Sequence, residues 1–145
     1  MIYSVTYFNP YGNCDNTVHV EAENEVDAAL IAHADFWVAS RSFNLDDYNV
    51  LEYNPEYIIK KDDVLAKNYG WTEDKLKEAK KEALKDYVIK NWKYGYRKDG
   101  KKGLKLLEAE VEFMFGKVEP CAVQDILLKS CDLDSRIVDF TSWGN

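Results

Sequence analysis

The chain has 145 residues, of which 46% are hydrophobic and 31% are charged, and its formal net charge is -7. This composition excludes a disordered chain, and seven glycines and three prolines exclude a collagen-like one. The longest nearly apolar stretch, residues 28–39, contains His33 and Asp35 and is too short to span a bilayer, and the N-terminus lacks the pattern of a signal peptide. Three cysteines without a framework spacing favour a reducing compartment, so we expect a soluble, cytoplasmic protein.

Charge is unevenly distributed along the chain. Residues 1–57 contain ten acidic side chains and a single basic one, Arg41. Residues 58–110 contain fifteen basic and ten acidic side chains, and residues 111–145 contain three and six. An excess of nine negative charges in the first 57 residues repels nucleic acid and attracts basic surfaces, over a range set by salt. A solvated surface that only keeps the protein soluble is the alternative.

The first elements that the sequence predicts are two strands of a β-hairpin. Residues 2–8 (IYSVTYF) place Tyr3, Val5 and Tyr7 on one face, and residues 17–22 (TVHVEA) alternate apolar and polar side chains in the same way. The intervening segment NPYGN is rich in turn-forming residues. One face of this hairpin should therefore be buried.

A helix and a third strand should follow the hairpin. Asn24 is a suitable N-cap, and apolar residues then recur at helical spacing until the helix ends near residues 40–42. Residues 48–53 (YNVLEY) predict the third strand, which Asn54 and Pro55 end.

The rest of the chain shows helical patterns. The expected helices run from Asp62 or Asp63 to Gly70, from Thr72 to Lys93, from Leu104 to Phe115 before Gly116, and from Pro120 to Cys131. Residues 136–140 fit either a strand or a helical turn.

Together these elements predict an α+β fold, with an N-terminal β-β-α-β unit packed with a C-terminal group of three to four helices. We expect a single domain over residues 1–145. Its acidic half would be residues 1–57 and its helical half residues 58–145, with a seam at residues 55–61.

A basic loop lies between two of the expected helices. It interleaves aromatic and basic side chains, namely Tyr94, Tyr96, Arg97, Lys98, Lys101 and Lys102. Rings that stack on bases and cations that contact phosphates are typical of nucleic-acid binding. The acidic N-terminal half would repel the same ligand, so an acidic protein surface or the chain's own N-terminal half is an equal alternative.

The same loop nearly matches a phosphate-binding loop. Residues 95–101 fit the pattern G-x-x-x-x-G-K, but Lys102 stands where Ser or Thr would bind magnesium. A phosphate-binding loop also follows a strand and begins a helix, whereas this one follows a long helix and Gly103 interrupts it. We therefore expect a flexible interhelical connection.

Residues 62–80 resemble the helix-turn-helix of phage-type repressors. The small residue Ala66 precedes Gly70 by four positions, as in that motif. The second helix would read DNA, yet it begins with Glu73 and Asp74, which phosphate groups repel. A DNA-binding regulator that uses residues 62–80 is the alternative function, and it predicts a dimer and steep salt dependence.

Side chains typical of catalysis are few. His19 alternates with valines in a strand, and His33 lies in an apolar helix, where a packing role is expected. Cys14 lies in the hairpin loop, and Cys121 and Cys131 have apolar neighbours. Because no nucleophile or metal motif is present, we expect a non-catalytic protein without metal or cofactor. An enzyme of unrecognised type that uses Cys14 or a histidine is the second alternative.

Acidic and aromatic residues are the candidates for partner binding. The acids that would supply the negative surface are Glu21, Glu23, Glu25, Asp27, Asp46, Asp47 and Glu52. Aromatic anchors are expected at turns, at Tyr7, Tyr11, Tyr53 and Tyr57, because rings bury large areas at low entropic cost. Packing within the chain is the alternative for these rings.

The partner that this combination favours is a protein with a basic surface. In class, though in no shared motif, the chain resembles the small acidic inhibitors of phages and mobile elements, such as anti-CRISPR and antirestriction proteins. That resemblance implies blocking of a basic nucleic-acid-binding surface of a host nuclease, with direct nucleic-acid binding less favoured and no membrane partner.

Overall fold

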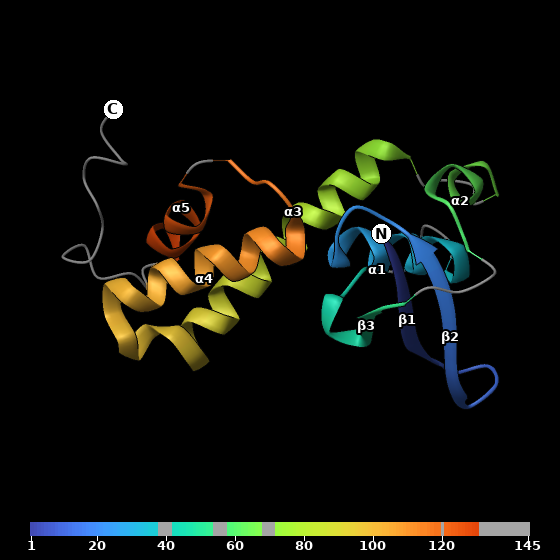
Figure 1. Ribbon diagram of the computed structural model, residues 1–145, viewed down its shortest axis with the longest axis horizontal. Helices are drawn as coiled ribbons and strands as arrows, with labels where there is room; N and C mark the ends of the chain where they lie inside the picture. Colours follow the sequence, from blue (N-terminus) through green and yellow to red (C-terminus); the bar gives the residue numbers. More distant parts are fainter. Residues whose placement is uncertain (38–41, 54–57, 68–71, 120, 131–145) are drawn as a thin grey trace. The chain divides into compact units, whose positions relative to one another are not determined.

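The chain has an α+β fold, a three-stranded antiparallel sheet at the N-terminus followed by helices, as the sequence predicts (Figure 1). The computed structural model describes residues 1–37, 42–53, 58–67, 72–119 and 121–130. Two compact units make up the chain, Met1–Ala83 and Leu84–Asn145. Their boundary lies inside a helix, whereas the sequence placed a seam at residues 55–61. The single domain expected from the sequence stays a prediction.

The sheet of the first unit has the strand order β2-β1-β3. Its strands are β1 (Ile2–Asn9), β2 (Cys14–Glu21) and β3 (Tyr48–Glu52). The hairpin of β1 and β2 is confirmed, and the Asn9 side chain accepts hydrogen bonds from the backbone N–H of Tyr11 and of Gly12 in its loop. Strand β2 begins earlier than predicted because backbone pairing continues to the pair Asn9–Cys14, where the side chains no longer alternate.

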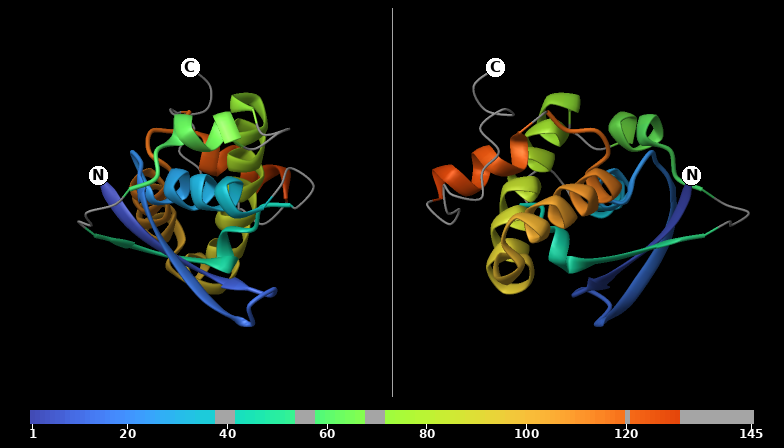
Figure 2. Two further views of the ribbon diagram at one scale, coloured as in Figure 1. Left: turned by 90° about the vertical axis from the view of Figure 1, so that its right-hand side faces the viewer. Right: turned by 60° about the vertical axis from the view of Figure 1, so that its left-hand side comes forward.

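Helix α1 (Glu25–Phe36) packs on one face of the sheet (Figure 2). That face presents the buried residues Tyr3, Val5 and Tyr7, as the alternation predicts. The predicted N-cap is confirmed, since the Asn24 side chain accepts the Asp27 N–H at 2.9 Å. The helix ends at Phe36, before the predicted end; residues 38–41 lie outside the described part.

Two further helical segments complete the first unit. Helix α2 (Lys61–Lys67) begins one residue before Asp62, so Asp62 and Asp63 lie in its first turn and not at a capping position. Helix α3 (Glu73–Asn91) has the predicted cap, because the Thr72 hydroxyl accepts the Lys75 N–H at 3.2 Å.

Every residue of α1 from 28 to 34 is buried, as expected of a helix that is apolar on all sides.

The second unit is helical. It contains the end of α3, the π-helical turn η2 (Trp92–Tyr96), the 3-10 turn η3 (Arg97–Asp99), α4 (Gly100–Phe115) and α5 (Ala122–Lys129). Its buried apolar side chains are Val88, Trp92, Leu104, Leu107, Val111, Phe115, Val123 and Leu127. Helix α4 ends before Gly116, whose φ of 79° is the left-handed conformation expected there. Pro120, Cys131 and residues 136–140 lie outside the described part.

The connection expected to be a flexible loop is instead helical. Residues 92–99 continue α3 through η2 and η3, and Gly103 lies buried within α4 instead of interrupting the chain before it. A Cβ atom at Gly103 would lie 2.0 Å from the carbonyl oxygen of Tyr96. Only glycine therefore allows this close approach of the turn to the helix.

A substitution at Gly103 should destabilise the second unit. We expect Gly103→Ala to lower the free energy of unfolding by about 2 kcal/mol or more, because backbone has to move to admit the methyl group. Gly95→Ala is the matched control, since a Cβ there meets nothing within 4 Å and alanine favours a helix by up to about 1 kcal/mol. Urea unfolding followed by circular dichroism measures both, and an equal effect of the two would contradict this account of Gly103.

Candidate functional site

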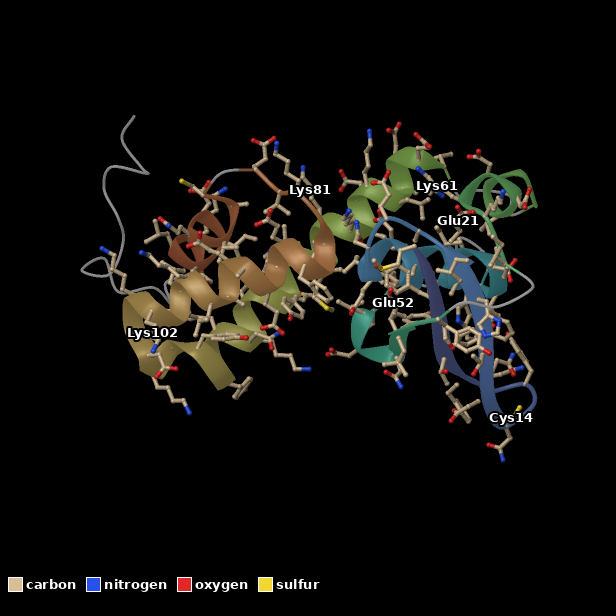
Figure 3. All side chains as sticks on the ribbon, in the orientation of Figure 1. Cys14, Glu21, Glu52, Lys61, Lys81 and Lys102 are labelled. Atoms are coloured by element: carbon tan, nitrogen blue, oxygen red, sulfur yellow. The ribbon has the colours of Figure 1, made fainter. Side chains whose placement is uncertain are left out.

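Five of the seven candidate acids lie near one end of the sheet. Strand β1 begins where β2 and β3 end, so Glu21 pairs with Ile2 and Glu52 pairs with Tyr3. Figure 3 labels Glu21 and Glu52 on the two strands that flank β1. The chain enters α1 directly after Glu21. We call the following residues the acidic end: Glu21, Glu23, Glu25, Asp27 and Glu52.

The other two acids lie at the opposite end of the sheet. Asp46 and Asp47 belong to the 3-10 turn η1 (Leu45–Asp47), directly before β3. Since Tyr48 pairs with Tyr7 near the end of β1, this turn is separated from the acidic end by the length of β3. The backbone N–H of Asp46 donates to the Asn44 side chain, as in a capped turn. The seven acids therefore do not form one continuous cluster.

Lysines neutralise part of the acidic end. Lys80 of α3 lies 3.0 Å from the carboxylate of Asp27, and Lys60 lies 3.9 Å from that of Glu21. Both bases come from residues 58–110, where the basic side chains are concentrated. The charge asymmetry read from the sequence is thus partly balanced within the first unit, a pairing that the sequence analysis missed. The excess of lysines after residue 58 was the available signal.

Of the five acids of the acidic end, three remain outside the ion pairs of the described residues, namely Glu23, Glu25 and Glu52. Glu23 and Glu52 are exposed, and Glu25 is half-buried. Burial raises the pKa of the Tyr3 hydroxyl, and the negative charges of Glu25, Glu52 and Asp27 raise that pKa further. Carboxylates from α1 and β3 therefore both disfavour ionisation of the Tyr3 hydroxyl.

An apolar patch lies on the sheet face opposite α1. Leu51 and Tyr53 are 61% and 51% exposed. The Tyr53 ring stacks on His19 of β2 with a centroid distance of 4.5 Å. His19 pairs with Ser4 of β1, and this small residue leaves room for two rings to meet above the central strand. This patch is next to Glu52 in sequence, so aromatic and acidic side chains lie on adjacent residues of one strand.

The other aromatic candidates have different environments. Tyr7 is only 5% exposed, and its ring lies 5.0 Å from Phe36, so it belongs to the core and not to a partner surface. Tyr11 is 84% exposed in the hairpin loop, with its ring 5.9 Å from Trp37. Tyr57 lies outside the described residues.

The basic loop is partly engaged within the second unit. The Tyr96 hydroxyl donates a hydrogen bond to the Glu110 carboxylate, which raises the pKa of Tyr96 and fixes the turn to α4. Tyr94 is 79% exposed. The basic side chains of this loop are exposed as well, namely Arg97, Lys98, Lys101 and Lys102. Figure 3 labels Lys102, on α4. Because this segment follows a helix and not a strand, it lacks the setting of a phosphate-binding loop.

The helix-turn-helix candidate consists of α2 and the start of α3. Lys61 lies 2.9 Å from Glu73, and their hydrogen bond lowers the pKa of the Glu73 carboxyl. Glu73 and Asp74 are exposed in the first turn of α3, where a recognition helix would contact bases. Gly70 and the Ala66 side chain lie outside the described part.

The candidate catalytic residues have packing or surface positions. His33 is buried, and its Nδ1 forms a hydrogen bond with the Tyr48 hydroxyl beside the Phe43 ring. Cys14 is exposed at the start of β2, next to the hairpin loop (Figure 3), and Cys121 is half-buried. Over the described residues, no three His, Cys, Asp or Glu side chains are grouped so as to hold a metal ion.

The first unit also has a cavity of about 480 Å³, which the sequence did not indicate. Leu30, Ile31 and Leu76 form its apolar lining. Its charged lining includes the pairs Asp27–Lys80 and Lys61–Glu73, so most of its charges already have partners.

Comparison with protein-family models, with curated proteins and with solved structures finds no match. Within the described residues, no helix has the length and apolar character needed to cross a membrane.

The ion pair of Asp27 should contribute more to stability than that of Glu73. The side chains of Asp27 and Lys80 are each about 30% exposed, whereas Lys61 and Glu73 are largely exposed. We expect Lys80→Met to lower the free energy of unfolding by about 1 kcal/mol and Lys61→Met to lower it by clearly less. Chemical denaturation of both variants measures this difference, and a larger loss for Lys61→Met would contradict it.

The stability of the fold should depend on pH through Glu25. Burial raises the pKa of the Glu25 carboxyl above its usual value of 4.5, so the folded chain holds this proton more tightly than the unfolded chain does. Relative to Glu25→Gln, the native protein should therefore gain stability as the pH falls from neutrality through the raised pKa, and the gain should level off below the usual value. Urea titrations over this pH range measure the difference in free energy of unfolding between the native protein and Glu25→Gln. A difference that does not change with pH would contradict the prediction.

Proposed function

We propose that this chain is a non-catalytic protein that binds a basic surface of a partner protein through the acidic end of its sheet. The observation that carries the proposal is that Glu52 pairs with Tyr3 at the start of β1, where Glu25 and Asp27 of the first turn of α1 also act on the Tyr3 hydroxyl. These carboxylates come from α1 and β3, so the fold and not the local sequence brings them together.

The lysine pairs define which acids are available to a partner. Glu21 and Asp27 contact Lys60 and Lys80, so their charge is partly compensated. Glu23, Glu25 and Glu52 are the proposed contacts for a basic surface. Charged groups of this kind guide encounter and select partners more than they add affinity.

Apolar contacts would supply the remaining binding energy. Leu51 and Tyr53 flank Glu52 and expose more than half of their surface. An exposed tyrosine beside a charged residue is typical of the anchors that dominate protein interfaces. Tyr53 is therefore the aromatic anchor of the proposal, and Tyr7 is left out because it is buried.

The class of partner is a protein that itself binds nucleic acid through a basic surface, such as a nuclease. Carboxylates at the acidic end would occupy the position of phosphate groups on that surface. A small inhibitor of the kind that phages and mobile elements use acts in this way, and the acidic end supports a role of this class.

The test uses a labelled peptide of nine arginines as a defined basic probe. We expect the triple variant Glu23→Gln, Glu25→Gln, Glu52→Gln to bind it about tenfold or more weakly, a loss of about 1.4 kcal/mol. Fluorescence anisotropy at about 50 and 200 mM salt measures affinity and its salt dependence.

A matched control separates the site from the net charge. The variant Asp15→Asn, Glu112→Gln, Glu119→Gln removes the same number of charges from exposed positions elsewhere. It should bind the peptide like the native protein. If both triple variants lose affinity equally, binding depends only on the net charge of the protein, and the proposed site at the acidic end is wrong. Salt-sensitive binding of duplex DNA in the same assay would instead favour the DNA-binding regulator.

A further inference from the structure

Strand β3 is an edge strand whose outer side has no partner strand among the described residues. The sheet order is β2-β1-β3, and within the described ranges β1 is the one strand that pairs with β3 (Figure 1). In an antiparallel pair, successive residues direct their backbone N–H and C=O groups alternately toward and away from the partner strand. One known hydrogen bond therefore determines, for each residue of β3, whether its backbone N–H and C=O groups point toward β1 or outward.

That hydrogen bond runs from the Tyr53 N–H to the Ile2 carbonyl oxygen, at 2.8 Å. With the register Tyr3–Glu52, the residues that bond to β1 are then Tyr53, Leu51 and Asn49. The backbone groups of Val50 and Glu52 point outward. Two alternate residues thus offer donors and acceptors to an additional strand.

One end of the opposite edge of the sheet is covered. Ile59 forms a parallel bridge with Val20 of β2. The Glu21 N–H donates to the Ile59 carbonyl at 3.0 Å, and the Ile59 N–H donates to the His19 carbonyl at 2.8 Å. The chain therefore protects the end of the outer edge of β2 with its own backbone, and β3 has no such protection among the described residues.

The sequence of β3 lacks the usual protection of an edge. Tyr48–Glu52 reads YNVLE and contains neither the proline nor the lysine with which proteins commonly block edge pairing. Its one charged side chain is Glu52, and Glu25 adds negative charge nearby, since both act on Tyr3. The charge at this edge favours a basic strand and disfavours an acidic one.

The two faces of β3 differ in chemistry, so the side chains of an added strand would meet a different surface on each face. Glu52 lies on the face of the sheet that carries Tyr3, whereas Leu51 lies on the opposite face, and Tyr53 beside it. A strand with basic side chains in one alternation and apolar side chains in the other would match Glu52 on one face and Leu51 with Tyr53 on the other.

We infer that the partner of this chain docks an extended basic segment onto the edge of β3, adding a fourth strand to the sheet. The inference rests on the proposed function and specifies how the acidic end recognises its partner. Backbone hydrogen bonds to Val50 and Glu52 give the contact its geometry, and the alternation of basic and apolar side chains gives it selectivity.

The experiment uses a peptide of eight residues in which arginine and valine alternate. Two further peptides carry N-methyl groups on all arginine amides or on all valine amides, so the three have equal charge and similar side chains. In a docked strand only one set of amides faces β3, and methylation of that set removes its hydrogen bonds. Calorimetry or anisotropy then compares the three affinities for the native protein.

We expect one methylated peptide to lose at least about tenfold in affinity, the equivalent of 1.4 kcal/mol, and the other to bind like the parent. If methylation of the arginine amides lowers the affinity, the added strand is antiparallel to β3. If methylation of the valine amides lowers it, the added strand is parallel. If the parent peptide binds and responds to the triple glutamine variant but both methylated peptides bind equally well, the proposed function stands and docking at the edge is wrong.

Other outcomes contradict the inference in a different way. If the parent peptide does not bind while the peptide of nine arginines does, the proposed function stands and docking at the edge is wrong, and if neither peptide binds, both are wrong. If sedimentation shows that the free protein is a dimer and the peptide does not bind, the occupant of the edge is a second copy of the chain and not a basic partner segment.

Discussion

A sheet of three strands with a helix on only one of its faces determines much of what this protein exposes. Helix α1 covers the face that carries Tyr3 and Val5, and it is itself buried throughout its central turns. The second face and the edge of β3 receive no such cover among the described residues. Leu51 and Tyr53 are exposed because nothing among the described residues packs on that second face. A small sheet therefore leaves a face and an edge exposed as a consequence of its size.

Charge pairing within the first unit determines which part of the acidic segment is available. The pairs of Lys60 with Glu21 and of Lys80 with Asp27 partly compensate the negative charge of those acids. Glu23, Glu25 and Glu52 keep their charge, and two of them act on the Tyr3 hydroxyl. The strongly negative N-terminal segment thus becomes a compact acidic end and not a uniform acidic surface.

Local patterns in the sequence predicted the elements well, because each depends on neighbouring residues. The caps at Asn24 and Thr72 and the end of α4 at Gly116 are examples. Alternation also placed Tyr7 on the buried face, whereas its position near the turn led us to expect a surface anchor; because Tyr7 is buried, that expectation is wrong. The lysine pairs could not be predicted, since they join residues far apart in sequence. Gly103 within α4 depends equally on tertiary contact, with the Tyr96 carbonyl.

Hydrogen exchange of the four backbone amides from Asn49 to Glu52, followed by NMR in the free protein, tests the open edge most directly. Amides that bond to β1 should be protected, whereas outward amides should exchange at rates close to those of an unfolded chain. We therefore predict slow exchange for Asn49 and Leu51 and fast exchange for Val50 and Glu52. If Val50 and Glu52 are protected as strongly as Leu51, the edge is already occupied and the account is contradicted.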